Sequence, residues 1–160
     1  MTTDQFTLVA IDPGVNGGIA WALPNGAINT AKMPDTEYGV VMLLVEISKA
    51  ANGRCKLYLE EPPLFAGKNI PGSAIGKLMW NAGICYGAGV GLGWTIHRIR
   101  PAIWMKAHAV GTKKSTGLSG SAWKNRLKAK AAELHSDLKI TLWNADAVLI
   151  LDAARRGAIN

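Results

Sequence analysis

Three acidic residues lie at the ends of apolar segments, where a carboxylate is costly to bury unless a cation accompanies it. Asp12 ends the apolar run of residues 6–12, Glu60 ends the run of residues 55–60, and Asp146 lies near the start of a third run. Because open α/β sheets bring the ends of their strands to a shared crevice, these carboxylates could meet there. A divalent cation with oxygen ligands would neutralise such a cluster, so the three acids indicate metal chemistry.

Each acid by itself also has an ordinary structural explanation. Asp12 precedes Pro13 and Gly14, and aspartate is common in such turns. Glu60 could be an exposed strand end, and Asp146 could favour the dipole of a helix in whose first turn it lies. The three acids together, in a chain that also carries a long basic segment, favour one shared site.

The chain is basic, with a formal net charge of +7, and its charges are unevenly distributed. All eleven acidic residues lie at or before Glu61 or at or after Glu133. The acid-free stretch between them carries Lys68, Lys77, Arg98, Arg100, Lys106, Lys113, Lys114, Lys124, Arg126, Lys128 and Lys130. A solvated helix face would explain the last four of these cations on their own. The absence of interspersed acids favours a polyanionic partner such as nucleic acid.

Apolar periodicity and turn-forming residues predict the elements that position these side chains. Strands are expected at residues 6–12, 18–23, 27–33, 55–60 and 94–99, with tight turns joining the first three. Helices are expected at 36–51, in the glycine-rich segment that begins near Ser73, in a short segment opened by Pro101, and at 121–134 and 144–156. Residues 62–71 and 111–120 are expected to be loops. This order predicts an α/β fold, a mixed β-sheet flanked by helices.

Length and composition predict one globular domain over residues 1–160. Two cysteines, Cys55 and Cys85, make no disulfide framework and are expected in the core. With no leader-like signature at the start of the chain, a reducing cytoplasmic setting is expected. The uncharged stretch of residues 78–97 is long enough to span a bilayer, but its five glycines and the polar Asn81 favour a buried helix and strand, without membrane association.

Five sets of short motifs, in order along the chain, resemble those of the RuvC-type Holliday junction resolvases, which belong to the RNase H-like superfamily. They are Ile11–Asp12–Pro13–Gly14 with Gly18–Ile19–Ala20, then Leu59–Glu60–Glu61–Pro62 with Lys68–Asn69, then Ser73 to Gly83 with Gly76 in place, then Pro101 with Trp104–Met105–Lys106, and finally Ala145–Asp146–Ala147. The fourth set resembles the phage-type branch of the family. The match covers nearly the whole chain, and the order of the motifs makes the set more specific than any one of them.

The resemblance implies an RNase H-like fold and a metal-dependent endonuclease that resolves four-way DNA junctions. It implies that Asp12, Glu60 and Asp146 hold two Mg²⁺ or Mn²⁺ ions for phosphodiester hydrolysis, with Glu60 rather than its neighbour Glu61 in the site. A phage-encoded enzyme of this kind would act in the host cytoplasm.

A homodimer is also expected, because a four-way junction has two-fold symmetry and symmetric cleavage calls for a two-fold enzyme. Gly83, Gly87 and Gly91 recur every four residues and would give a helix a smooth stripe for close approach. Such a stripe could mediate the dimer contact or could pack against the sheet.

The sequence departs from the family pattern just before Asp146. Family members usually carry another acid or histidine there, whereas this chain has Trp143 and Asn144. Asn144 could be the N-cap of the last helix, a neutral metal ligand, or an engineered replacement of a carboxylate. Asp137 and Asp152 are alternative ligands, although Asp152 lies six residues beyond Asp146 and so nearly on the opposite face of a helix.

Basic and aromatic side chains could complete the site. Lys113 or Lys114, in the loop of residues 111–120, could place a charge on the scissile phosphate or simply contact the backbone. The residues expected to bind DNA are Lys68, Lys77, Arg100, Lys106, Lys113, Lys114, Lys124 and Lys128. The tryptophans Trp80, Trp104 and Trp123 could stack on opened bases, but packing in the core is the favoured interpretation.

Two other classes of function remain open. The basic segment alone would suit a non-catalytic DNA-binding module. The Asp12–Pro13–Gly14 turn with its nearby glycines also resembles the first phosphate loop of actin-like ATPases. Those enzymes need two lobes, and 160 residues are too few for that architecture.

Overall fold

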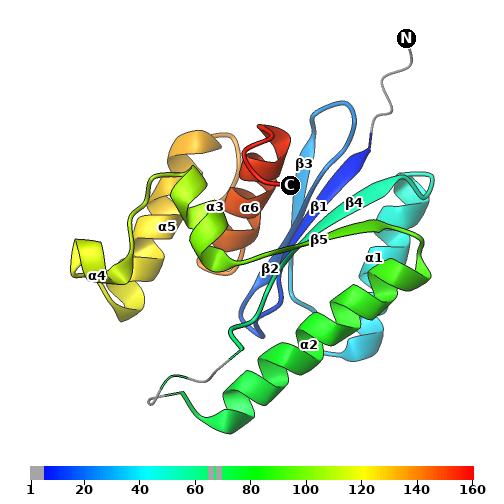
Figure 1. The fold of residues 1–160 in the computed structure, drawn as a ribbon. Coiled ribbons are helices and arrows are strands. Elements are labelled where there is room, and N and C mark those ends of the chain that lie inside the picture. Colours follow the sequence, from blue (N-terminus) through cyan, green and yellow to red (C-terminus); the bar gives the residue numbers. More distant parts are fainter. Residues whose placement is uncertain (1–5, 65–66, 68–69) are drawn as a thin grey trace.

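A five-stranded mixed sheet forms the centre of the molecule (Figure 1). The computed structural model describes residues 6–64, 67 and 70–160. The strands are β1 (Thr7–Asp12), β2 (Gly18–Ala22), β3 (Ile28–Lys32), β4 (Cys55–Glu60) and β5 (Thr95–Ile99), and their order across the sheet is β3-β2-β1-β4-β5. The first three strands form the predicted antiparallel meander, whereas β4 runs parallel to both β1 and β5.

Helices cover both faces of this sheet (Figure 1). One face carries α1 (Glu37–Ala50) and α2 (Gly72–Gly91), and the other carries α3 (Pro101–Ala107), α5 (Gly120–Leu134) and α6 (Ala145–Arg155). Because side chains alternate along a strand, Val9 and Ile11 of β1 pack in the α1–α2 layer, while Ala10 between them packs in the layer of α5 and α6. The predicted α/β fold, with a mixed sheet flanked by helices, is confirmed.

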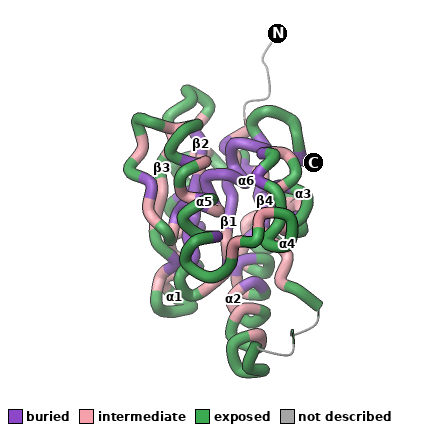
Figure 2. Tube along the Cα trace, turned by 90° about the vertical axis from the view of Figure 1, so that its left-hand side faces the viewer, coloured by how far each residue is buried: buried purple, intermediate pink, exposed green. Residues whose placement is uncertain are grey.

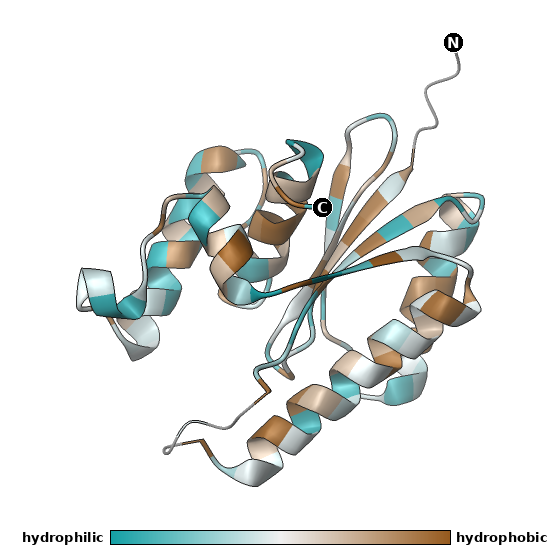
Figure 3. Cartoon of the chain, in the orientation of Figure 1, coloured by the Kyte–Doolittle hydropathy of each residue, from teal (hydrophilic) through white to brown (hydrophobic). Residues whose placement is uncertain are grey.

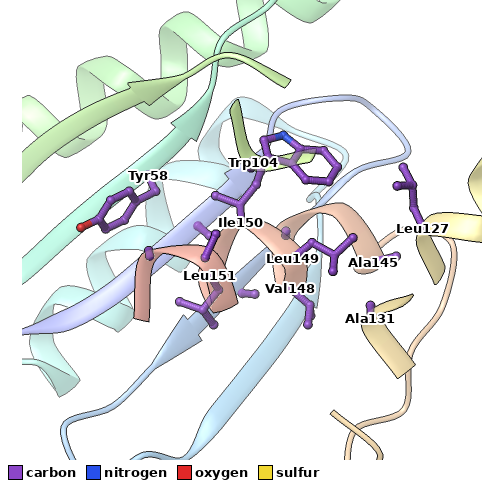
Figure 4. Close-up of a cluster of buried hydrophobic side chains, with 14 of the residues drawn as sticks. Tyr58, Trp104, Leu127, Ala131, Ala145, Val148, Leu149, Ile150 and Leu151 are labelled. Atoms are coloured by element: carbon purple, nitrogen blue, oxygen red, sulfur yellow. The ribbon is translucent and has the colours of Figure 1, made fainter. Parts of the chain in front are cut away.

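The last helix, α6, is enclosed by the sheet on one side and by α3 and α5 on the other (Figure 2). All of its residues are buried except Asp146 and Arg155. Its side chains Val148 to Leu151 fill the space between β1, Trp104 of α3 and Leu127 of α5 (Figure 4). The helix is correspondingly rich in hydrophobic residues (Figure 3). A carboxylate in its first turn is therefore held at a fixed position relative to β1.

The segment of residues 111–120, predicted to be a loop, contains one short helix, α4 (Lys113–Thr116). Its start is fixed by a reciprocal capping box. The backbone N–H of Ser115 donates to Thr112 Oγ1 at 3.0 Å, and the backbone N–H of Thr112 donates to Ser115 Oγ at 2.9 Å. Two hydroxyl residues three positions apart were the local signal for this helix.

The uncharged stretch of residues 78–97 forms part of α2 and all but the last two residues of β5, as predicted. The helix is buried along one side only, at Ala82, Cys85 and Gly89, and the first half of α2 is largely exposed. Both cysteines are buried, in agreement with the predicted core positions. Among the described residues, no helix combines the length and apolar character needed to cross a membrane.

Candidate active site

The three acids singled out by sequence line one pocket of about 280 Å³. Asp12 and Glu60 end β1 and β4, which are adjacent parallel strands, so their carboxyl ends lie next to each other. Asp146 comes from the first turn of α6, which packs on β1 and β2. The structure thus brings together carboxylates from distant parts of the sequence, since Asp12 and Asp146 are 134 residues apart.

Asp12 is oriented by the tight turn that follows it. Its Oδ1 accepts a hydrogen bond from the backbone N–H of Gly14 at 3.0 Å, and the N–H of Gly17 donates to the carbonyl of Gly14 at 2.8 Å. A Cβ on Gly17 would lie 2.3 Å from the carbonyl oxygen of Asp12 and 2.8 Å from Oδ2. Only glycine fits there, because any side chain would displace the carboxylate of Asp12.

Glu60 is held by a buried tryptophan. The indole Nε1 of Trp104, on α3, donates to Glu60 Oε2 at 2.7 Å. Trp104 is fully buried against α6 (Figure 4), which confirms the expected core packing and adds a polar role that the sequence did not suggest. Burial, reinforced by the negative charges of Asp12 and Asp146, raises the pKa of Glu60 to about 8, although the Trp104 hydrogen bond partly opposes this.

The other two carboxyl groups, Asp12 and Asp146, also have raised pKa values, which disfavour their charged forms. Burial and the charge of Asp12 raise the pKa of Asp146 to about 7. Burial also raises the pKa of Asp12, against the opposing influence of the Gly14 hydrogen bond and the positive charge of Lys124. Three carboxyl groups that resist ionising together form a site that a bound cation would relieve.

A basic side chain, Lys124 of α5, lines this pocket together with the three acids. Lys113 and Lys114, predicted as possible catalytic lysines, lie on the exposed helix α4 and do not line the pocket, so their role stays a prediction. Residues 113–116 form a capped turn of their own. The next basic helix, α5, is the element that reaches the carboxylates.

Asn144, predicted as a helix cap, a neutral metal ligand or a replaced carboxylate, does not line the carboxylate pocket. Its Oδ1 accepts from the backbone N–H of Thr141 at 2.8 Å, and its Nδ2 donates to the carbonyl of Lys139 at 3.0 Å and to Thr30 Oγ1 at 3.4 Å. The residue occupies the N-cap position of α6, but its side chain makes no capping hydrogen bond. Asn144 therefore braces the segment before α6 against β3, and both of its amide atoms are engaged in doing so.

The alternative ligand Asp152 lies at the other end of α6. Its Oδ2 accepts from Arg156 Nε at 2.7 Å, and its Oδ1 lies 3.1 Å from His135 Nε2. These partners hold the pKa of Asp152 below its ordinary value despite burial. Asp152 therefore belongs to a structural ion-pair network, and the other alternative, Asp137, is exposed.

Oxygen donors of this kind suit Mg²⁺ or Mn²⁺, which prefer carboxylate ligands. Among the described residues, no three His, Cys, Asp or Glu side chains are gathered closely enough to hold one ion by themselves. The electrostatics of the three carboxyl groups favour a bound metal ion. Asp12, Glu60 and Asp146 share a pocket, and Asp12 raises the pKa values of the other two. The residues present thus suit divalent cations in their chemistry and their need for positive charge.

Most of the predicted DNA-binding residues lie on the side of the molecule formed by α3, α4 and α5 (Figure 1). Exposed or half-buried cations on this side are Arg100, Lys106, Lys113, Lys114, Lys124 and Lys128. Lys77 lies elsewhere, on α2, in a hollow that it shares with Asp35 and Glu37. Lys68 lies outside the described residues.

The tryptophans divide into two groups. Trp104 and Trp123 are buried, as expected for core residues. Trp80 is 68% exposed, so the preferred interpretation of core packing is wrong for this residue. It lies on the exposed first half of α2, where its Nε1 donates to Glu37 Oε1 at 3.4 Å.

Comparison with known proteins places the fold. No protein-family model and no curated protein matches the sequence. RuvC from T. thermophilus in complex with a Holliday junction substrate matches over 96% of this chain and 97% of that chain, with a TM-score of 0.60 and 16% identity. A further structure of Thermus thermophilus RuvC matches over 96% of this chain and 98% of that one, with a TM-score of 0.57 and 17% identity. The chain therefore has the RuvC fold, an RNase H-like α/β architecture, as its motifs predicted.

Proposed function

We propose that residues 1–160 form one nuclease domain that cleaves four-way DNA junctions by metal-assisted phosphodiester hydrolysis. The observation that carries this proposal is the meeting of Asp12, Glu60 and Asp146 in one pocket beside Lys124. A fold shared over nearly the whole chain with RuvC supports the same conclusion. The basic surface of α3, α4 and α5 supplies charge for the DNA backbone.

The chain's own residues divide the chemistry among them. Asp12, Glu60 and Asp146, together with water and phosphate oxygens of the bound DNA, would hold two Mg²⁺ or Mn²⁺ ions, which when bound would supply an activated water and stabilise the leaving oxygen. The indole of Trp104 fixes the direction of Glu60 through its 2.7 Å hydrogen bond. The ammonium group of Lys124, at the rim of the carboxylates, would bind the scissile phosphate and offset its charge.

A cleavage assay tests this function directly. With Mg²⁺, the protein should cut a four-way junction much faster than duplex or single-stranded DNA of the same sequence, and no cleavage should occur when the metal is chelated. Binding of the junction without cleavage under any metal condition would indicate the non-catalytic DNA-binding module instead. ATP hydrolysis without nuclease activity would indicate an actin-like relative.

We also propose that the enzyme acts as a homodimer that contacts its partner through α2. A Cβ at Gly83, Gly87 or Gly91 would meet no atom within 4 Å, so this stripe is not packed on the sheet. The neighbouring Tyr86 and Val90 are exposed apolar side chains on the same helix. A smooth apolar helix surface of this kind allows close approach of a second copy, as the two-fold symmetry of a junction requires.

Replacing Gly87 by arginine should convert the dimer into a monomer without unfolding it, because the new side chain meets open space in the isolated chain. Sedimentation velocity at micromolar concentration should show the parental protein as a dimer and the Gly87→Arg variant as a monomer. Gly87→Ala is the matched control and should remain dimeric. A parental protein that sediments as a monomer, both alone and with junction DNA, would overturn the dimer proposal.

A further inference from the structure

Asn81 is the polar residue in the middle of the uncharged stretch, and the fold gives it a specific partner. Its Nδ2 donates to the carbonyl oxygen of Pro13 at 2.6 Å, across 68 positions of sequence. Pro13 is buried, so its carbonyl needs a protein partner. The amide of Asn81, from α2, supplies that partner.

The acceptor belongs to the turn that orients Asp12. Within this turn, the Gly14 N–H donates a hydrogen bond to the Asp12 carboxylate, and the Gly17 N–H donates one to the Gly14 carbonyl. Both of these hydrogen bonds are internal to the turn. The end of the turn is attached to the residue after β3, because the Met33 N–H donates to the Gly17 carbonyl at 3.0 Å. The start of the turn is attached to α2 by the Asn81 hydrogen bond.

The position of Asn81 on α2 makes this attachment important. Residues 72–80 are largely exposed, and the buried side of the helix begins at Ala82. Asn81 therefore lies next to the point at which α2 becomes buried. One turn earlier, Leu78 lines the carboxylate pocket, as does Val15 of the Asp12 turn. The hydrogen bond thus joins the two segments that form this wall of the pocket.

We propose that Asn81 is a positioning residue, whose side-chain amide ties the Asp12–Pro13–Gly14 turn to α2 and so sets the direction in which Asp12 presents its carboxylate. Without the amide, the buried Pro13 carbonyl has lost its donor, and the turn gains by moving toward water. Asp12 moves with it, since its Oδ1 is bonded to Gly14 within the same turn. The role in metal binding rests on the proposed function, whereas the role in holding the turn does not.

Two substitutions at Asn81 separate the contribution of its hydrogen bond from the contribution of its packing. Asn81→Leu keeps the bulk and removes the donor, and Asn81→Gln keeps an amide donor on a longer side chain. Ser73→Ala, on the exposed start of α2, is the control. The full-length variants are compared by amide hydrogen exchange at Gly14, by Mn²⁺ affinity from the electron paramagnetic resonance of the free ion, and by thermal melting.

In Asn81→Leu, exchange at Gly14 should accelerate about tenfold, and Mn²⁺ should bind about tenfold more weakly, the range found when a residue that orients a ligand is lost. Asn81→Gln should recover part of both effects, and Ser73→Ala should match the parental protein. Unchanged exchange at Gly14 in Asn81→Leu would overturn the proposal. A parental protein that binds no Mn²⁺ would defeat the proposed function, while the exchange measurement would still decide the role of Asn81.

Discussion

Replacing Asp12 or Asp146 by asparagine, or Glu60 by glutamine, is expected to abolish junction cleavage while leaving the fold and junction binding intact. Each substitution removes one charged metal ligand and keeps the shape of the side chain. The several kcal/mol of transition-state stabilisation that metal ions provide corresponds to a loss of roughly a thousandfold or more in rate. Single-turnover cleavage in Mg²⁺, with gel-shift binding in parallel, measures both quantities. Binding should hold or tighten, because each change removes negative charge from the pocket that receives the phosphate.

Glu61→Gln is the matched control for Glu60→Gln. Glu61 is next in sequence, but its carboxylate lies 3.8 Å from Arg98 Nη1. It shares a neighbouring hollow with Glu60 but does not line the pocket that holds Asp12 and Asp146. This variant should cut at close to the parental rate. If Glu61→Gln were inactive and Glu60→Gln active, the assignment along β4 would be shifted by one residue. If all four variants cut at the parental rate, the nuclease proposal would fail.

The metal-free protein is expected to lose stability as the pH rises from 6.5 to 8.5. The pKa of Glu60 is raised from its ordinary value of 4.5 to about 8, mainly by burial. The native state therefore keeps a proton that the unfolded chain releases near pH 4.5, so stability falls as the pH rises from 4.5 to about 8. Asp146, with its pKa raised to about 7, adds to the fall in the lower part of the interval. Each retained proton changes the free energy of unfolding by roughly 1.4 kcal/mol per pH unit. Over this interval Tm should fall by about 5 °C.

The Glu60→Gln variant tests the cause of this slope. It should melt with a weaker pH dependence and, at pH 8.5, at a higher temperature than the parental protein, because the neutral amide still accepts from Trp104 and no longer repels Asp12. Mg²⁺ at millimolar concentration should restore the stability of the parental protein at pH 8.5, since it binds the native state. The interval lies above the ordinary pKa of His108, 6.5, which burial lowers further, so that residue contributes little. A parental Tm that rises with pH, or an equal slope in the variant, would contradict this explanation.

The local pattern of the sequence was enough to predict the mixed sheet, most of its flanking helices and the strand-end carboxylates Asp12 and Glu60. Strands and helices leave a period of apolar residues, and tight turns leave glycine, proline and asparagine, so both can be read in short windows. Asp12 and Glu60 could be assigned because each ends such a strand, and parallel neighbouring strands finish at the same edge. Asp146 could be assigned only with the help of its motif, because the periodicity of α6 left its direction open.

The tertiary structure alone decided which other groups reach the site. Lys124 rather than Lys113 or Lys114 joins the carboxylates, since this depends on how α5 lies against α6. Asn144 joins residues 139–141 to β3 through hydrogen bonds of its side chain, and neither its residue type nor its neighbours in sequence reveal these partners.

The environments of the tryptophans and of Asn81 also depend on burial and on contacts between segments far apart in the sequence. Trp104 is enclosed with its N–H directed at Glu60, whereas Trp80 is exposed because the first half of α2 extends beyond the sheet. Asn81 meets Pro13 only after 68 residues of chain have folded between them. Residue type and spacing specify what a side chain can do within its own element. Which element it faces is fixed by packing between segments far apart in sequence, and that packing leaves no periodic signal to read.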